Sequence, residues 1–207
     1  MIKVVLVDDD PIVLHGMSMI VEAREDLALM GTAEDGMGAV KLCREIKPDV
    51  TVLDIRMPDM DGIEVTKVIL REELSSPLLL TTFDEPELIE RALQAGAKGY
   101  ILKNSPAERI VSAIKTVAEG GTVFAPDIVD YIRGMTRNAP QDFFSDLTHR
   151  EKDIVELIAQ GFSNSQIAEE LYLSNGTVRN YISGILEKKG LEHRTQIAVK
   201  YYLDDRS

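Results

Sequence analysis

Residues 4–11 read VVLVDDDP, and residues 49–62 read DVTVLDIRMPDMDG. Each stretch runs from a short apolar segment directly into carboxylates, which is typical of a buried parallel strand that ends at a polar edge. Segments with helical periodicity separate these strands from three further apolar runs, at residues 27–33, 78–81 and 99–102. Five strands that alternate with helices over residues 1–120 predict an α/β doubly wound fold with a five-stranded parallel sheet.

The composition of the 207-residue chain is that of a globular protein, with 44% hydrophobic and 28% charged residues. At about 100–150 residues per domain, this length allows one large domain or two small ones. No apolar run approaches the roughly 18–20 residues that span a bilayer, and the first residues lack the pattern of a signal peptide. The single cysteine, Cys43, excludes an internal disulfide framework and the usual paired-cysteine zinc sites. We therefore expect a cytoplasmic protein without a membrane partner.

The net charge of -12 argues at first against a nucleic-acid partner, because phosphate backbones favour positive charge. The acidity, however, is concentrated in one part of the chain. Residues 1–125 carry 13 Lys and Arg against 22 Asp and Glu, whereas residues 172–203 carry five basic and two acidic residues. The mildly basic C-terminal stretch keeps DNA binding open for that part of the chain.

Acidic residues gather at the expected carboxyl edge of the sheet. Asp8, Asp9 and Asp10 follow the first strand and Asp54 follows the third, and these two strands are neighbours in the order 2-1-3-4-5. Carboxylates held close together repel one another unless a cation neutralises them, and hard oxygen ligands favour Mg²⁺. Asp10 directly precedes Pro11, so it fits the N-cap of the next helix better than a metal site.

The same edge of the sheet carries a hydroxyl and an ammonium group. The fourth strand ends in Thr81 and Thr82, and the fifth ends in Lys103. A carboxylate nucleophile, a divalent ion, a hydroxyl and a lysine are the groups that phosphoryl transfer requires. Either threonine could supply the hydroxyl, and Lys103 taken alone would more often be a solvated surface residue.

Four segments resemble the receiver domain of bacterial two-component response regulators, over residues 1–120: VVLVDDDP, DVTVLDIRMPDMDG, LLLTTFD and AGAKGYILKNS. The resemblance implies that Asp54 accepts a phosphoryl group from a histidine kinase, while Asp8 and Asp9 hold Mg²⁺. It also implies a backbone carbonyl ligand from Arg56, phosphoryl binding by Thr81 and Lys103, and an aromatic switch at Tyr100 that moves with Thr81.

The pattern changes beyond residue 122. Residues 123–145 contain one short amphipathic segment and then an aperiodic stretch, which predicts a linker with a short helix. Residues 146–207 show helical periodicity only, and Thr148 and Glu151 fit a capping box at the start of the first helix. The chain is thus predicted to hold a receiver at 1–122, a linker at 123–145 and a small all-α four-helix domain at 146–207.

The predicted helical domain has helix-turn-helix spacing, with a short helix, a tight turn at Leu173 and a longer helix capped by Ser174. The longer helix presents polar residues where a recognition helix meets base edges: Asn175, Thr177, Arg179, Asn180 and Ser183. Three basic residues are placed to contact phosphates: Lys188, Lys189 and Arg194. A four-helix unit with a polar face could equally be a packing module.

Residues 147–151 (LTHRE), 161–190 (GFSNSQIAEELYLSNGTVRNYISGILEKKG) and 194–199 (RTQIAV) closely resemble the LuxR-type DNA-binding domain of the NarL/FixJ response regulators. The resemblance implies promoter binding, with a last helix that forms a dimer contact on DNA through Val199, Tyr202 and Leu203. These three residues could instead close the core of the domain. Lys189 stands where the family usually has Leu, so it could alter the packing or add a phosphate contact.

The combined features predict a phosphorylation-controlled transcriptional regulator that binds promoter DNA as a homodimer, rather than a metabolic enzyme. One alternative is a Mg²⁺-dependent phosphohydrolase with an aspartyl-phosphate intermediate, because Asp8 and Asp10 form an Asp-x-Asp motif after the first strand. A second alternative is a DNA binder independent of phosphorylation, with the receiver as a dimerisation module. The helical domain argues against the first alternative, and the complete acidic site argues against the second.

Overall fold

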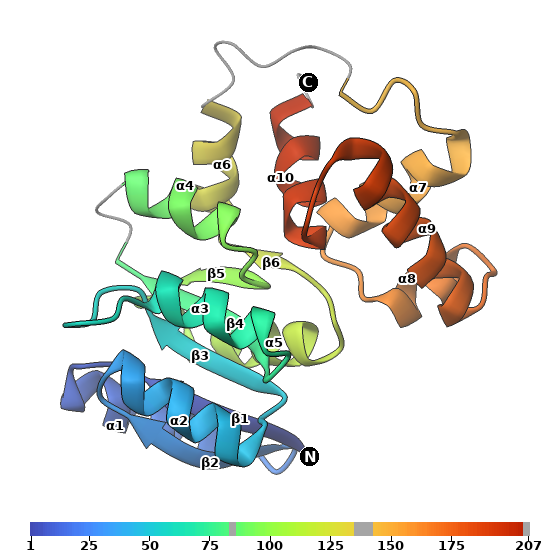
Figure 1. Cartoon of the computed structure of the whole chain (residues 1–207). Helices are drawn as coiled ribbons and strands as arrows, with labels where there is room; N and C mark the ends of the chain where they lie inside the picture. Colours follow the sequence, from blue (N-terminus) through green and yellow to red (C-terminus); the bar gives the residue numbers. More distant parts are fainter. Residues whose placement is uncertain (83–85, 135–142, 205–207) are drawn as a thin grey trace.

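The computed structural model describes residues 1–82, 86–134 and 143–204, and Figure 1 shows an α/β region beside a helical region. Within these residues the α/β region has six strands: β1 (Ile2–Val7), β2 (Leu27–Ala33), β3 (Val50–Asp54), β4 (Ser76–Thr81), β5 (Gly99–Leu102) and β6 (Val123–Phe124). Its helices are α1 (Pro11–Glu22), α2 (Gly36–Ile46), α3 (Gly62–Arg71), α4 (Pro86–Gln94), α5 (Ala107–Ala118) and α6 (Pro126–Gly134). The doubly wound α/β fold is confirmed.

The sheet has one strand more than predicted, since its order is β2-β1-β3-β4-β5-β6 and all neighbouring pairs are parallel. Strand β6 is held by backbone hydrogen bonds from Val123 N–H to the Lys98 carbonyl (3.1 Å) and from Ala125 N–H to the Tyr100 carbonyl (2.9 Å). Two residues are too few to produce a periodic signal in the sequence. Part of the segment expected to be a linker therefore packs as the edge strand, while the division into domains stays a prediction.

Helices cover both faces of the sheet and bury two separate clusters of apolar side chains. On one face, α1 and α5 pack against the strands through residues that include Leu14, Val21 and Ile114. On the other face lie α2, α3, α4 and α6, with buried residues that include Ile69, Ile89 and Ile128. Each fully buried large apolar side chain stabilises the fold by about 1.5–3 kcal/mol. These layers hold the carboxyl ends of the strands in place.

Several acidic residues of the sequence start helices. The Asp10 carboxylate accepts a hydrogen bond from the Ile12 N–H (2.8 Å), and the Asp61 carboxylate accepts one from the Glu64 N–H (2.8 Å). Such side chains satisfy N–H groups that the first helical turn leaves unpaired. The prediction that Asp10 is an N-cap is confirmed.

The helical region contains α7 (His149–Ala159), α8 (Asn164–Glu170), α9 (Asn175–Lys189) and α10 (Arg194–Asp204). Thr148 and Glu151 form the predicted capping box, and Ser174 caps α9. A third apolar cluster holds the four helices together, with Ile154, Ile167, Val178, Ile185 and Ile197 fully buried. The predicted four-helix unit is confirmed.

The last helix, α10, lies between the two regions and contacts α7 on one side and α4 and α6 on the other (Figure 1). We call this packing of α10 on α4 and α6 the closed arrangement. Helix α9 contributes its own buried side to the helical cluster and lies on the side of that region away from the sheet. Among the described residues, no helix combines the length and apolarity needed to cross a membrane.

Candidate phosphorylation site and nucleic-acid interface

The predicted acidic site forms where β1 and β3 end side by side. Asp8 follows β1, Asp54 is the last residue of β3, and both side chains are buried, with exposed fractions of 3% and 4%. Asp9 is exposed beside them. One ligand oxygen from each of the three carboxylates lies within 4.8 Å of the others. The register that pairs Val7 with Leu53 brings these residues together, as the strand order predicts.

Lys103, which follows β5, bridges the two buried carboxylates. Its Nζ lies 2.8 Å from Asp8 Oδ2 and 3.0 Å from Asp54 Oδ2. Burial raises the pKa of the Asp54 carboxyl, and the hydrogen bond and positive charge of Lys103 only partly offset this effect. Burial works against the Lys103 ammonium too, yet hydrogen bonds to Asp8 and Asp54 raise its pKa overall. One ammonium for three clustered carboxylates leaves an excess of negative charge at the site.

This excess of charge fits a hard divalent cation, because carboxylate oxygens are the ligands that Mg²⁺ prefers. Asp9 and Arg56 also line an open hollow of about 500 Å³ next to the buried carboxylates. The hollow leaves room for a hydrated ion and a phosphoryl group. The Asp54 carboxylate accepts a hydrogen bond from the Arg56 N–H, whereas the expected role of the Arg56 carbonyl as a metal ligand stays a prediction.

The end of β4 lies next to the site. Thr81 is the last residue of this strand and is buried, whereas Thr82 is exposed. The Thr81 carbonyl accepts a hydrogen bond from the Lys103 N–H (2.8 Å), which ties the two strand ends together. Between the two threonines, Thr81 therefore fits the role of the site hydroxyl better.

Tyr100 lies in the middle of β5, and β6 covers it. Its side chain has no exposed surface, and no described residue offers its hydroxyl a hydrogen bond. Burial raises the pKa of Tyr100 well above its usual value. Its ring stacks on Phe124, with 6.1 Å between ring centroids. The predicted five-stranded sheet has β5 at its edge, so the complete burial of Tyr100 is unexpected. The movement of Tyr100 with Thr81 stays a prediction.

The predicted recognition face lies on the exposed side of α9. Arg179, Asn180 and Ser183 are exposed, and the receiver does not cover them. Asn175 Nδ2 donates to Ser165 Oγ (2.8 Å), and the Thr177 N–H donates to Ser174 Oγ (3.0 Å). Asn175 and Thr177 thus hold the start of α9, while the next turns present their polar groups to solvent.

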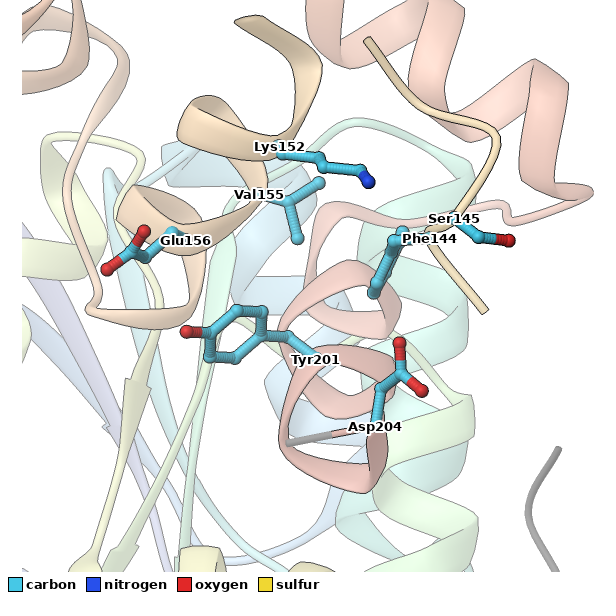
Figure 2. Close-up of a pocket in the computed structure, with 7 residues that line it drawn as sticks. All are labelled: Phe144, Ser145, Lys152, Val155, Glu156, Tyr201 and Asp204. Atoms are coloured by element: carbon cyan, nitrogen blue, oxygen red, sulfur yellow. The ribbon is translucent and has the colours of Figure 1, made fainter. Parts of the chain in front are cut away.

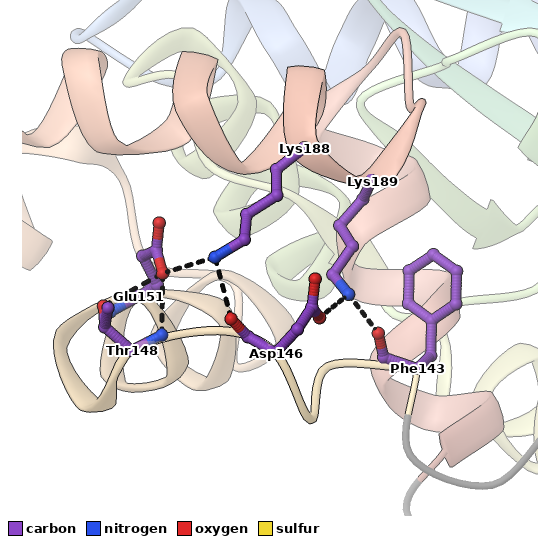
Figure 3. Close-up of polar contacts among 6 residues, drawn as sticks. All are labelled: Phe143, Asp146, Thr148, Glu151, Lys188 and Lys189. Carbon is purple, nitrogen blue, oxygen red and sulfur yellow. Dashed lines mark hydrogen bonds and ion pairs between the residues drawn. The ribbon is translucent and has the colours of Figure 1, made fainter.

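Figure 3 shows that the two lysines at the end of α9 contact the chain just before α7. Lys188 Nζ donates to the Asp146 carbonyl (2.8 Å) and lies 3.4 Å from Glu151 Oε2. Lys189 forms an ion pair with Asp146, donates to the Phe143 carbonyl and has only 8% of its side chain exposed. The structure gives Lys189 a packing role, and the expected phosphate contact would require these bonds to break.

Arg194, a predicted phosphate contact, instead joins the two regions. Its guanidinium donates to the Gly120 carbonyl (2.7 Å), to Asn164 Oδ1 (3.0 Å) and to the Phe162 carbonyl (2.5 Å). The residue is 6% exposed, and burial lowers the pKa of Arg194 to about 10. A buried guanidinium with these partners is not placed to meet DNA, so the phosphate role expected for it is wrong for this arrangement.

The predicted dimer contacts are partly buried in the closed arrangement. Val199, Tyr202 and Leu203 pack against the apolar cluster of the sheet. The Tyr202 hydroxyl donates to the Ala159 carbonyl (2.5 Å), and its ring meets Phe124 edge-on at 6.3 Å. The surfaces of these side chains that face α4 and α6 are not accessible to a second chain in this arrangement, and their role as dimer contacts stays a prediction.

Polar contacts hold the first turn of α10 on the receiver. Thr195 Oγ1 donates to the Ala97 carbonyl (2.8 Å) in a buried position. The ring of His193 lies over Gly96, whose φ is +82°, and a Cβ at Gly96 would come within 2.9 Å of the ring Nε2. Sequence reasoning did not find His193, Thr195 or Phe124, because contacts this distant in the chain leave no local signal.

His193 at this interface leads to a predicted pH dependence. Burial lowers its pKa, the positive charge of Lys98 lowers it further, and Glu192 partly opposes both. A histidine whose pKa is lower in the folded state contributes its full stability above the unfolded value of about 6.5, and that stability is lost as the pH falls. We expect the midpoint temperature of thermal unfolding to decrease when the pH is lowered from about 7.5 to about 5.5. The His193→Gln variant should show a smaller decrease. The His15→Gln variant, which changes an exposed histidine, should show the same decrease as the wild type. An equal decrease in the wild type and both variants would contradict the prediction.

A separate hollow of about 270 Å³ lies between α7, α10 and the chain before α7 (Figure 2). Lys152, Glu156 and Asp204 place charges of both signs around it, and the Tyr201 ring forms part of its wall. The residues around it do not include Asp54, Lys103 or the exposed face of α9. It is therefore separate from both the acidic site and the DNA-facing surface.

Two family models match the chain, one described as response regulator receiver domain (residues 4–115) and one as bacterial regulatory proteins, luxR family (residues 145–201). The transcriptional regulatory proteins LnrK and LiaR of Bacillus subtilis (strain 168) are similar in sequence. LnrK is 37% identical over 210 residues and LiaR 38% over 203, and each match covers 96% of both chains.

Solved structures are similar over the whole length. The response regulator ChrA of a heme-sensing two-component system is 32% identical, with a TM-score of 0.57 and 98% of each chain covered. A structure of two RcsB dimers bound to two parallel DNAs is 25% identical, with a TM-score of 0.60 and coverage of 100% of this chain and 99% of RcsB.

Proposed function

Since the chain belongs to the bacterial response regulators that join a receiver to a LuxR-type DNA-binding domain, it is a transcriptional regulator, and we propose that phosphorylation of Asp54 controls it. The donor in this proposal is a histidine kinase, and the phosphorylated form is a homodimer on promoter DNA in the cytoplasm. The observation that carries the proposal is the bridge from Lys103 to Asp8 and Asp54 at the edge of the sheet where β1, β3 and β5 end.

The proposed chemistry begins with the Asp54 carboxylate. One of its oxygens attacks the phosphorus, an acyl phosphate forms, and the bond from phosphorus to the donor nitrogen breaks with its electron pair left on nitrogen. Lys103, 3.0 Å from Asp54, offsets negative charge on the phosphoryl oxygens, and the Thr81 hydroxyl donates to one of them. Asp8 and Asp9 would hold Mg²⁺, which supplies further positive charge when bound. The receiver assists its own phosphorylation and dephosphorylation in this way and has no metabolic substrate.

The consequence proposed for phosphorylation is the loss of the closed arrangement. Phosphorylation shifts a conformational equilibrium only if the phosphoryl group favours one state over the other. In the closed arrangement the exposed face of α9 is open to solvent, but Val199, Tyr202 and Leu203 are partly buried against the receiver. We therefore propose that phosphorylation regulates dimerisation through α10 rather than the access of DNA to the recognition helix α9.

The DNA contact in this proposal comes from the exposed turns of α9. Arg179 and Asn180 suit guanine and adenine edges, respectively, and Asn175, Thr177, Ser183 and Lys188 flank them. Two copies related by a dyad would reach half-sites about one helical turn, or roughly 34 Å, apart. RcsB, which is similar over its whole length, has a solved structure as dimers on DNA.

A binding series with genomic fragments tests the proposed function directly. The full chain is incubated with random fragments at several salt concentrations, with and without a small-molecule phosphodonor and Mg²⁺. We expect the phosphodonor to tighten binding to a small set of fragments at least about tenfold, because dimerisation engages two half-sites. The salt dependence should be shallow, since few basic residues face DNA. Binding that is equally tight without phosphodonor would favour the DNA binder independent of phosphorylation.

A further inference from the structure

Phe124 occupies a position that no other described hydrophobic residue shares. Its partly buried ring packs against the apolar cluster of the sheet and also against the cluster of the helical region. It lies in β6, the short strand that the sequence pattern did not predict. Phe124 therefore adds a receiver side chain to the interface that α10 forms through Val199, Tyr202 and Leu203 and through the polar contacts of Arg194 and Thr195.

The ring of Phe124 contacts one aromatic residue of each domain. On the receiver side it is nearly parallel to Tyr100, with an interplanar angle of 15° and 6.1 Å between centroids. On the other side it meets Tyr202 of α10 edge-on, at 81° and 6.3 Å. Arg133 of α6 lies over the Tyr202 ring, with its guanidinium carbon 5.6 Å from the centroid. The rings form a continuous series from β5 to α10.

Both ends of this series are held in place by the surrounding structure. Tyr100 has no exposed surface, and β6 is bonded to β5 on either side of Phe124. The Tyr202 hydroxyl is bonded to the Ala159 carbonyl of α7. The surroundings of Tyr100 are close-packed and have few voids that could absorb a shift of its ring. Phe124 and Tyr202, by contrast, also line a hollow of about 310 Å³, into which a displaced Phe124 ring can move. A movement of Tyr100 must therefore move Phe124 or open a gap beside it.

The polar contacts of α10 lie elsewhere. Arg194 and Thr195 bind receiver carbonyls in the first turn of the helix, whereas Tyr202 lies two turns further on. The first-turn contacts involve Gly120 and Ala97, outside β5 and β6. Phe124 is thus the direct packing link between the interior of β5 and the predicted dimer face.

We propose that Phe124 is a positioning residue that couples the state of Tyr100 to the release of α10, so that phosphorylation at Asp54 is read out through this ring. The phosphorylation part of this inference rests on the proposed function. The packing part does not, since it states only that Tyr100 and Tyr202 are energetically coupled through the Phe124 ring that both contact. The two parts call for separate measurements.

The first experiment uses the full chain with Phe124→Ala and the milder Phe124→Leu, next to Val123→Ala as a matched control. Val123 is the neighbour of Phe124 in β6 but packs on the other face of the sheet. Asp54 phosphate is measured by intact mass, and the dimer fraction by sedimentation with and without acetyl phosphate and Mg²⁺. We expect the phosphodonor to change the dimer dissociation constant at least about tenfold in the wild type and in Val123→Ala, and less than about twofold in the Phe124 variants, at equal phosphate content.

The second experiment needs no phosphate. Denaturant unfolding is measured for Tyr100→Leu, Tyr202→Leu and the double variant, once in the wild-type background and once with Phe124→Leu. We expect the effect of Tyr202→Leu on the unfolding equilibrium constant to change at least about threefold when Tyr100 is replaced, and this coupling to vanish with Phe124→Leu.

The outcomes separate the two ideas. Additive effects of Tyr100 and Tyr202 in both backgrounds would overturn the coupling through Phe124, whatever the phosphate does. Coupling in the second experiment together with a wild type that neither accepts phosphate nor dimerises would reject the proposed function and keep the packing link. A phosphodonor response in Phe124→Leu equal to that of Val123→Ala would reject Phe124 as the readout of phosphorylation.

Discussion

Replacing Asp54 with Asn is expected to lower Mg²⁺-dependent incorporation of a phosphoryl group about 1,000-fold or more, because the amide is not a nucleophile. The fold should persist, since Asn matches the shape of Asp and Lys103 keeps its ion pair with Asp8. Burial raises the pKa of Asp54, which means that the folded chain disfavours this charge, so its removal carries no cost from desolvation. The measurement is phosphate content by intact mass together with thermal unfolding.

The matched control is Asp59→Asn, which makes the same chemical change five residues further along the chain. Asp59 is exposed and has a φ of 67°, a conformation that Asn adopts as readily as Asp. The phosphate content of the Asp59→Asn variant should equal that of the wild type. A phosphoryl group that is still incorporated on Asp8 in the Asp54→Asn variant would support the phosphohydrolase alternative. An unchanged oligomeric state and promoter affinity under phosphodonor would support the DNA binder independent of phosphorylation.

Replacing Gly62 with Ala is expected to lower the free energy of unfolding by about 3 kcal/mol. Gly62 is the first residue of α3 and lies against the backbone of Asp54. Its N–H donates to the Ile55 carbonyl (3.0 Å). A Cβ there would press on the carbonyl oxygen of Asp54 and lie 3.0 Å from the carbonyl carbon and 3.1 Å from the Cα of Ile55. These are backbone atoms, so no side chain can rotate to relieve the overlap.

Because the overlap falls on the backbone of Asp54, the same change should impair phosphorylation of molecules that remain folded. A displacement near 1 Å at a reacting group costs about 100-fold in rate. The control is Gly16→Ala in α1, where a Cβ meets no atom within 4 Å. That change should stabilise the chain by about 0.5–1 kcal/mol, as Ala does in an open helical position, and leave phosphorylation unchanged. Equal stabilities of the two variants would show that this contact is unimportant.

The sequence predicts the receiver well, because neighbouring positions in the chain carry most of its signals. Apolar runs mark β1 to β5, and the acids that follow β1 and β3 meet because parallel strands end at one edge. The residues that start helices are also local, as Asp10, Thr148 and Ser174 show. The acidic site therefore follows from strand order and the residue types at strand ends.

The packing between the domains does not follow in the same way. Lys189 and Arg194 contribute to a basic stretch when charges are counted, yet both side chains turn inward to carbonyls and carboxylates far away in the sequence. Strand β6 has only two residues, and Phe124 by itself looks like any aromatic residue after a helix. Such contacts depend on how the two folded domains pack against each other, and this packing leaves no periodic pattern in the sequence.

In the proposed mechanism α10 packs on the receiver in one state and forms the dimer contact in the other, so the abundance of the protein becomes part of the signal. When this helix leaves α4 and α6, apolar side chains that the receiver covered, including Val199 and Leu203, meet water. An opened chain then has two fates: it closes again at a rate independent of concentration, or it meets a second opened chain at a rate that rises with concentration. The response to a given level of phosphate would therefore be steeper in cells that hold more copies, which ties the sensitivity of the switch to the expression of its own gene.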